Sequence, residues 1–145
     1  MSLIGGLTRE QLRAQYVDAW EKGKAGKPLS SQETMIYEII ELHDEYKVIL
    51  DNREHALAFD PDPAAAASNP FLHMGLHLAV REQISIDRPA GIRQLAQDLC
   101  NRLGPHAGEH ALMKALGETL WEAGSVGQPP DVNRYLEKAR ALLER

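Results

Sequence analysis

The chain has 145 residues, with 43% hydrophobic and 26% charged residues, which is typical of a soluble globular protein with room for one core. Its net charge of −5 disfavours nucleic acid as a partner, because phosphate backbones require a basic face. The longest apolar run, residues 71–80, is too short to span a bilayer, and the first residues do not resemble a secretion signal. With Cys100 as the single cysteine, these features predict a cytoplasmic protein that binds neither nucleic acid nor membrane.

The spacing of the apolar residues predicts an all-α protein, since no segment alternates as a strand does. About six helices are expected, near residues 8–22, 30–50, 70–86, 89–103, 106–123 and 131–145. Short connections favour antiparallel neighbours in a helical bundle, which we expect to form a single domain over residues 1–145. Residues 1–7 are expected to be a flexible N-terminus, and the proline- and alanine-rich residues 60–68 an internal linker.

Capping residues mark several of these helix ends. The predicted caps are Thr8 with Gln11, Ser30 with Glu33, Asn69 before Pro70, Asp87 and Asp131. A break in the second helix is expected near His43 and Asp44, where four acidic neighbours favour a solvated helix end. Trp20 and Trp121 are expected to anchor the packing, and Cys100 to be a small core residue.

The segment from Phe71 to Ile86 is apolar on every side, which predicts a helix buried at the centre of the fold. It carries His73 and His77, which lie about 40° apart on a helical wheel and can face one site. Buried imidazoles need either hydrogen-bond partners or a metal ion. Near the end of this helix we expect a polar cluster formed by Arg81, Glu82, Gln83 and Asp87.

A second histidine pair, His106 and His110, repeats the same spacing and has Glu109 beside it. Imidazole and carboxylate groups are ligands that transition metals favour. The candidate ligands for a divalent ion such as Zn, Fe, Ni or Mn are therefore His73, His77, His106, Glu109 and His110. The string His-x-x-Glu-His also matches a short metalloprotease signature, but this small helical chain shows none of the other features of such a protease. The Glu-x-x-His motif of di-iron bundles does not occur in the sequence either.

No reaction follows from these residues, and no motif indicates an organic cofactor or a catalytic nucleophile. The alternative to metal binding is a non-enzymatic interaction module. Its histidines would form a buried hydrogen-bond network, and its partner would be another protein or a second copy of the chain, giving a homo-oligomer.

The stretches "NPFLHMGLHLAVREQISIDRPAGI", residues 69–92, and "HAGEHALMKALGETLWEA", residues 106–123, resemble a family of bacterial proteins known as domain of unknown function 1841. The likeness covers roughly residues 8–136. It implies a small cytoplasmic protein without an assigned activity. The family pattern includes the positions of Asn69, Pro70, His73, His77, Glu82, Gln83, Asp87, His106, Glu109 and His110. Lys47 stands where the family usually has a histidine.

Overall fold

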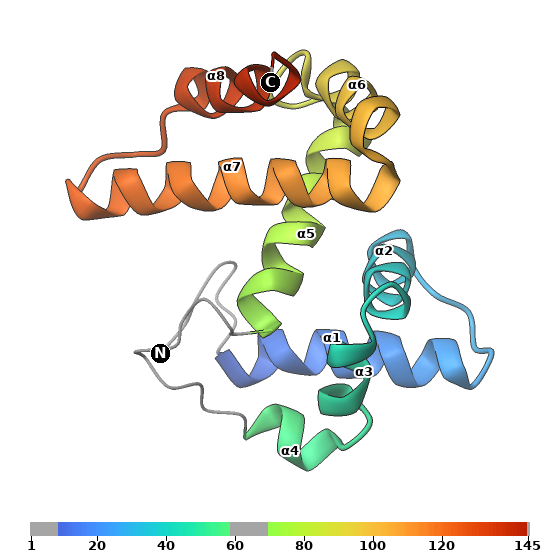
Figure 1. The fold of residues 1–145 in the computed structure, drawn as a ribbon. Coiled ribbons are helices and arrows are strands. Elements are labelled where there is room, and N and C mark those ends of the chain that lie inside the picture. The colour runs from blue at the N-terminus through green and yellow to red at the C-terminus, as the bar shows by residue number, and fades with distance from the viewer. Residues whose placement is uncertain (1–8, 59–69, 145) are drawn as a thin grey trace. The chain divides into compact units, whose positions relative to one another are not determined.

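The computed structural model describes residues 9–58 and 70–144 (Figure 1). These residues form eight α-helices and no strand, so the predicted all-α class is confirmed. The expected number of about six helices was too low, because the second predicted helix is divided and a further short helix follows it. The predicted flexible N-terminus, residues 1–7, and the linker, residues 60–68, lie outside the described residues. The predicted caps Thr8 and Asn69 do so as well.

The chain divides into two compact units, residues 1–74 and 75–145. Helix α5 (Pro70–Ile86), whose bounds agree with the predicted helix, begins in the first unit and continues in the second. The expectation that residues 1–145 form a single domain stays a prediction.

The first unit is built from four helices and the start of α5. They are α1 (Arg9–Lys24), α2 (Ser31–Glu41), α3 (Asp44–Leu50) and α4 (Arg53–Leu57). The capping box at Ser30 and Glu33 is confirmed, with the serine hydroxyl accepting from the Glu33 amide at 3.1 Å. The break predicted near His43 is confirmed too, since it separates α2 from α3. Local capping chemistry therefore sets the start of α2.

Two aromatic side chains, Trp20 and Tyr37, connect α1 with other helices of this unit. Trp20 is buried, as predicted, and its Nε1 donates to Asp51 at 2.8 Å. Gly23 lies directly against the ring of Tyr37, so that a Cβ at residue 23 would come within 2.1 Å of it. This close approach requires glycine on α1.

The expectation of a solvated helix end at His43 was wrong. His43 is only 3% exposed, its Nδ1 donates to the carbonyl of Ile39 at 2.7 Å, and its ring stacks on Tyr46. Burial raises the pKa of Tyr46 to about 12. The acidic neighbours point outward, while the imidazole replaces water with a carbonyl acceptor and a ring contact.

The second unit contains α6 (Ile92–Leu103), α7 (Pro105–Ser125) and α8 (Val132–Leu143), which pack against one another and receive the last turns of α5. Its core consists of Val80, Ile92, Leu95, Ala96, Leu99, Leu112, Met113, Ala115, Leu116, Tyr135, Leu136 and Ala139. Asp131 caps α8, as predicted, by accepting from the amide of Arg134 at 3.1 Å. Asp87 does not occupy the N-cap of α6, which is Gly91, but its Oδ1 accepts from the amides of Gly91 and Arg93 at 3.2 and 3.0 Å.

Helices α6 and α7 lie close together at Gly108. A Cβ at this position would lie 2.7 Å from the Cα, N and Sγ atoms of Cys100. Cys100 itself is half-buried, which is less than the predicted core position implies. The turn of α7 that carries His106 and His110 therefore packs directly against α6, because Gly108 has no side chain.

The structure buries α5 and Trp121 less than expected. Helix α5 is not covered on every side, because Leu72 and Ile86 are 48% and 64% exposed. Trp121 is 73% exposed, so the expectation that it anchors the packing was wrong. None of the helices in residues 9–58 and 70–144 is long and apolar enough to cross a membrane.

Candidate metal centre

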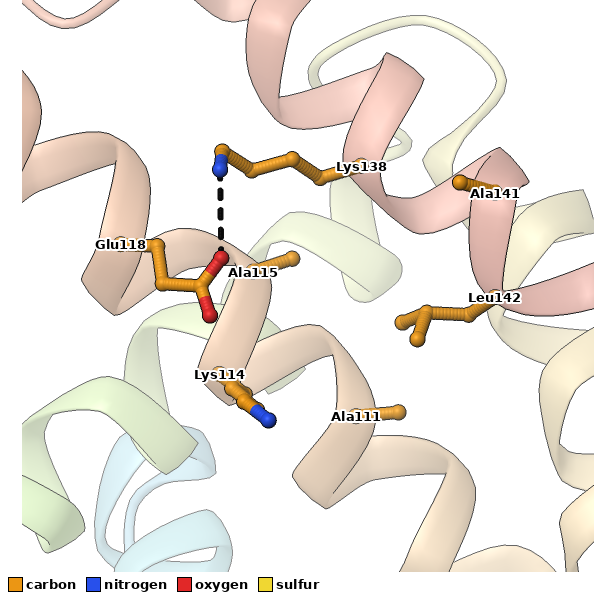
Figure 2. A pocket seen from close by; sticks show the side chains of 7 residues that line it. All are labelled: Ala111, Lys114, Ala115, Glu118, Lys138, Ala141 and Leu142. Carbon is orange, nitrogen blue, oxygen red and sulfur yellow. Dashed lines mark hydrogen bonds and ion pairs between the residues drawn. The ribbon is translucent and has the colours of Figure 1, made fainter.

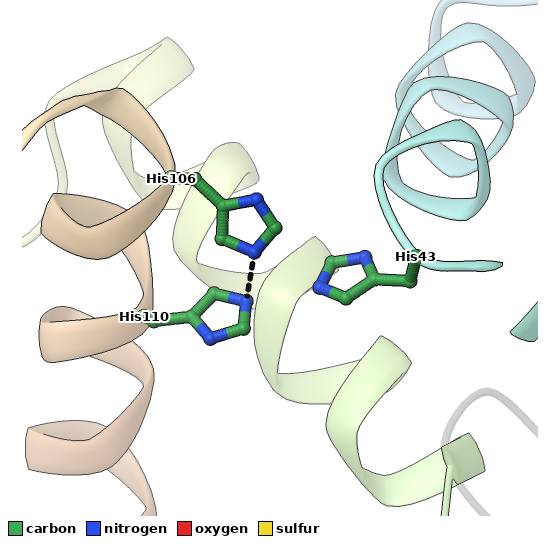
Figure 3. Close-up of side chains that lie close together, drawn as sticks. All are labelled: His43, His106 and His110. Atoms are coloured by element: carbon green, nitrogen blue, oxygen red, sulfur yellow. Dashed lines mark hydrogen bonds between the residues drawn. The ribbon is translucent and has the colours of Figure 1, made fainter. Parts of the chain in front are cut away.

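The first turns of α7 bring His106 and His110 together. Gly104, with a φ of 100°, ends α6, and Pro105 then begins α7, so that both histidines lie one turn apart on a regular helix. Figure 3 shows the two rings side by side on α7, joined by a hydrogen bond. Their Nε2 atoms are 2.8 Å apart, and their ring centres are 4.2 Å apart. His106 is exposed and His110 is half-buried. At this separation one nitrogen donates a hydrogen and the other accepts it, because two protonated rings would repel each other.

His77 lies on α5 and is fully buried. Its Nε2 donates to Oε1 of Glu109 at 2.7 Å, which joins α5 to α7. The ring centre of His77 is 5.5 Å from that of His110, to which it is nearly perpendicular, and 6.4 Å from that of His106. The second unit thus gathers four of the five residues that the sequence indicated.

Glu109 is the anionic centre of this group. The Nε and Nη2 atoms of Arg81 each donate to its Oε1 at 3.3 Å, alongside His77. Burial alone would raise the pKa of Glu109, but the hydrogen bond from His77 and the charge of Arg81 together hold the pKa below its usual value. Glu109 is therefore ionised at neutral pH, and its charge is balanced by Arg81.

His73 lies one turn before His77 on α5, in the part of the helix that belongs to the first unit. It is half-buried. Because His73 and His77 are four residues apart on α5, their side chains leave the same side of this helix.

The residues expected to form a polar cluster have separate partners. Arg81 binds Glu109, Gln83 accepts from the hydroxyl of Tyr135 at 2.7 Å, and Asp87 binds the start of α6. Glu82 is exposed. Tyr135 was not singled out in the sequence, and no local pattern could have indicated it, because 52 residues separate it from Gln83.

A family model described as a domain of unknown function (DUF1841) matches residues 8–141, which is nearly the whole chain. No curated protein and no solved structure matches the chain.

Proposed function

The chain belongs to the DUF1841 family, whose description names no activity, and we propose that it binds a divalent transition-metal ion through His106 and His110. The observation that carries the proposal is the distance of 2.8 Å between their Nε2 atoms. Metal–nitrogen bonds of about 2.0–2.1 Å hold two adjacent ligands roughly 2.9–3.4 Å apart. The two rings would need to separate by only a few tenths of an ångström, and the ion would replace the hydrogen that they share.

His77 is the third ligand in this proposal. Two imidazoles bound to one ion have ring centres about 4.5–5.2 Å apart in adjacent positions. The separation of 4.2 Å between His106 and His110 lies just below this range, whereas the separations of 5.5 and 6.4 Å that involve His77 lie above it. To become a ligand, the His77 ring would therefore have to move toward both other rings, by about 1 Å in the case of His106. Since Nε2 of His77 donates to Glu109, Nδ1 is the atom of a neutral ring that offers a lone pair.

Glu109 supports the site by orienting His77. Carboxylates that accept from the second nitrogen of a metal-binding histidine fix its tautomer and raise its basicity. Oε1 of Glu109 already serves His77 and Arg81, so we assign this carboxylate to holding the histidine. Three protein ligands would leave a position open for water or for a substrate.

The donor set narrows the choice of metal. The sequence was compatible with Zn, Fe, Ni and Mn. Imidazole nitrogens suit Zn, Fe and Ni, whereas Mn prefers oxygen ligands. We therefore expect the strongest binding for Zn and Ni and the weakest for Mn.

The test is metal analysis, with calorimetric titration of Zn and Ni, on protein purified without a polyhistidine tag. The parent protein should bind about one equivalent of metal, and His106→Ala and His110→Ala should each weaken binding at least tenfold. His55→Ala, which removes an exposed histidine of α4, is the matched control and should bind like the parent. His73→Ala tests separately whether that residue contributes. A parent that binds no metal, or a His110→Ala variant that binds as tightly as the parent, would overturn the proposal.

A second candidate function is an interaction module without a metal. It is favoured by the burial of His77, which donates to Glu109. Arg81 donates to the same carboxylate, so the charge of Glu109 is balanced without an ion. Trp121 and its exposed neighbours Leu120 and Val126 would then offer a surface for a partner protein or a second copy. Sedimentation of the metal-free protein at increasing concentration tests the second copy, and Trp121→Ala should abolish any self-association.

A further inference from the structure

The groove between α7 and α8 carries balanced charges (Figure 2). Figure 2 shows Lys138 paired with Glu118, and Lys138 also binds Glu122 at 2.7 Å. Since Lys114 lines the same groove, two lysines stand beside two glutamates, and the groove favours neither an anion nor a cation. The polar groups around His77 are arranged differently, because they converge on one carboxylate oxygen.

Two residues of α5 hold the same oxygen of Glu109. His77 and Arg81 are four residues apart, so their side chains leave the same side of the helix. Nε2 of His77 donates to Oε1 of Glu109 at 2.7 Å, and Nε and Nη2 of Arg81 donate to it at 3.3 Å each. The side chains of Arg81 and Glu109 are 20% and 18% exposed, so little water competes for these bonds. The carboxylate is thereby held by both a guanidinium group and an imidazole.

The guanidinium group restrains Glu109 in a way that the imidazole alone does not. The terminal torsion of a glutamate has a broad energy minimum, so a single hydrogen bond leaves the carboxylate able to turn away from His77. Arginine presents its N–H donors in a rigid plane, and two of them on one oxygen limit that rotation. An acceptor that is held in place keeps the hydrogen of His77 on Nε2 and leaves the lone pair of a neutral ring on Nδ1.

We propose that Arg81 is a positioning residue of the metal centre, which acts through Glu109 to fix the tautomer of His77. The consequence for metal binding rests on the proposed function, in which Nδ1 of His77 is the third ligand atom. The charge of Arg81 predicts the opposite effect on affinity, because a cation near the centre repels a divalent ion. The sign of the change in metal affinity therefore separates positioning from simple electrostatics.

The experiment compares the parent protein with Arg81→Met, which keeps an unbranched side chain but removes the N–H donors and the charge. Long-range correlation of ring protons with ring nitrogens in the full, metal-free chain reports which nitrogen of His77 carries the hydrogen. The parent should show the Nε2–H form alone, and Arg81→Met should show a mixture of the two tautomers. In calorimetric titrations the Zn affinity of Arg81→Met should be about tenfold lower than that of the parent.

Two further variants separate the rigid donors from the charge. Arg88→Met removes an exposed cation that follows α5, and this matched control should keep the parent tautomer and should not weaken Zn binding. Arg81→Lys keeps the charge without the planar donors, so it should restore neither readout in full. Complete rescue by Arg81→Lys would overturn the role of the rigid guanidinium plane.

The failure of this inference differs from the failure of the proposed function. A single Nε2–H form of His77 in Arg81→Met, or Zn binding as tight as that of the parent, would overturn the role of Arg81. A parent protein that binds no Zn would overturn the proposed function, and the tautomers of the metal-free chain would still decide whether Arg81 positions His77.

Discussion

Replacing Gly108 by alanine tests a close contact between α6 and α7. The added Cβ would lie 2.7 Å from the Cα and N atoms of Cys100 on α6, and these backbone atoms cannot rotate away. Helices α6 and α7 would have to separate, which loosens the core between them. Because the same turn of α7 carries His106 and His110, the positions of these two histidines relative to α6 would change too.

Two opposing effects set the size of the change. Alanine is a better helix former than glycine by about 1 kcal/mol, which stabilises the helix. Inserting an extra carbon into a packed interface costs about 1–3 kcal/mol. The matched variant Gly117→Ala lies on the same helix, where the new Cβ would meet only Leu76 Cδ1 at an ordinary 3.5 Å. Both variants gain the same helix-forming free energy. Their free energies of unfolding should therefore differ by about 1–3 kcal/mol, which is the cost of overpacking alone.

The assay is thermal unfolding of the metal-free protein followed by circular dichroism. Gly117→Ala should raise the Tm slightly, and the Tm of Gly108→Ala should lie below that of Gly117→Ala by about 2–12 °C, at roughly 2–4 °C for each kcal/mol in a chain of this size. If Gly108→Ala were as stable as Gly117→Ala, the close packing of α6 on α7 would be refuted.

Three further variants or measurements test the polar contacts of the second unit. Glu109→Gln should lower the free energy of unfolding by about 1–2 kcal/mol at pH 7, since it weakens charged hydrogen bonds of a half-buried group. The hydrogen bond from His77 and the charge of Arg81 hold the pKa of Glu109 below its usual value, so its contribution is fully present above that usual value and is lost as the pH falls through the folded pKa. A difference between variant and parent that does not shrink in urea titrations between pH 7 and the lowest pH at which the protein stays folded would contradict this. Burial, helped by the charge of Glu109, raises the pKa of the Cys100 thiol, so a disulfide reagent at pH 8 should react more slowly with the folded than with the unfolded chain. Equal rates would argue against that environment. Tyr135→Phe removes the hydroxyl that donates to Oε1 of Gln83 and should lower the free energy of unfolding by about 1–2 kcal/mol in urea titrations. An unchanged midpoint would mean that water replaces the hydroxyl.

The sequence alone determined the features that depend on a few neighbouring residues. The all-α class, the bounds of α5 and the caps at Ser30 and Asp131 follow from helical periodicity and from side chains that bond to amides three residues away. The approach of His106 and His110 belongs to the same group, because residues four apart are neighbours on any helix.

Burial and long-range partners were decided by tertiary structure. His77 takes a carboxylate 32 residues away, which no spacing within α5 could indicate. An apolar pattern did not reveal that Trp121 is exposed, nor did a run of acidic residues reveal that His43 is buried. Whether a side chain is covered depends on which distant segment packs over it, and a helical wheel gives only the direction in which the side chain points.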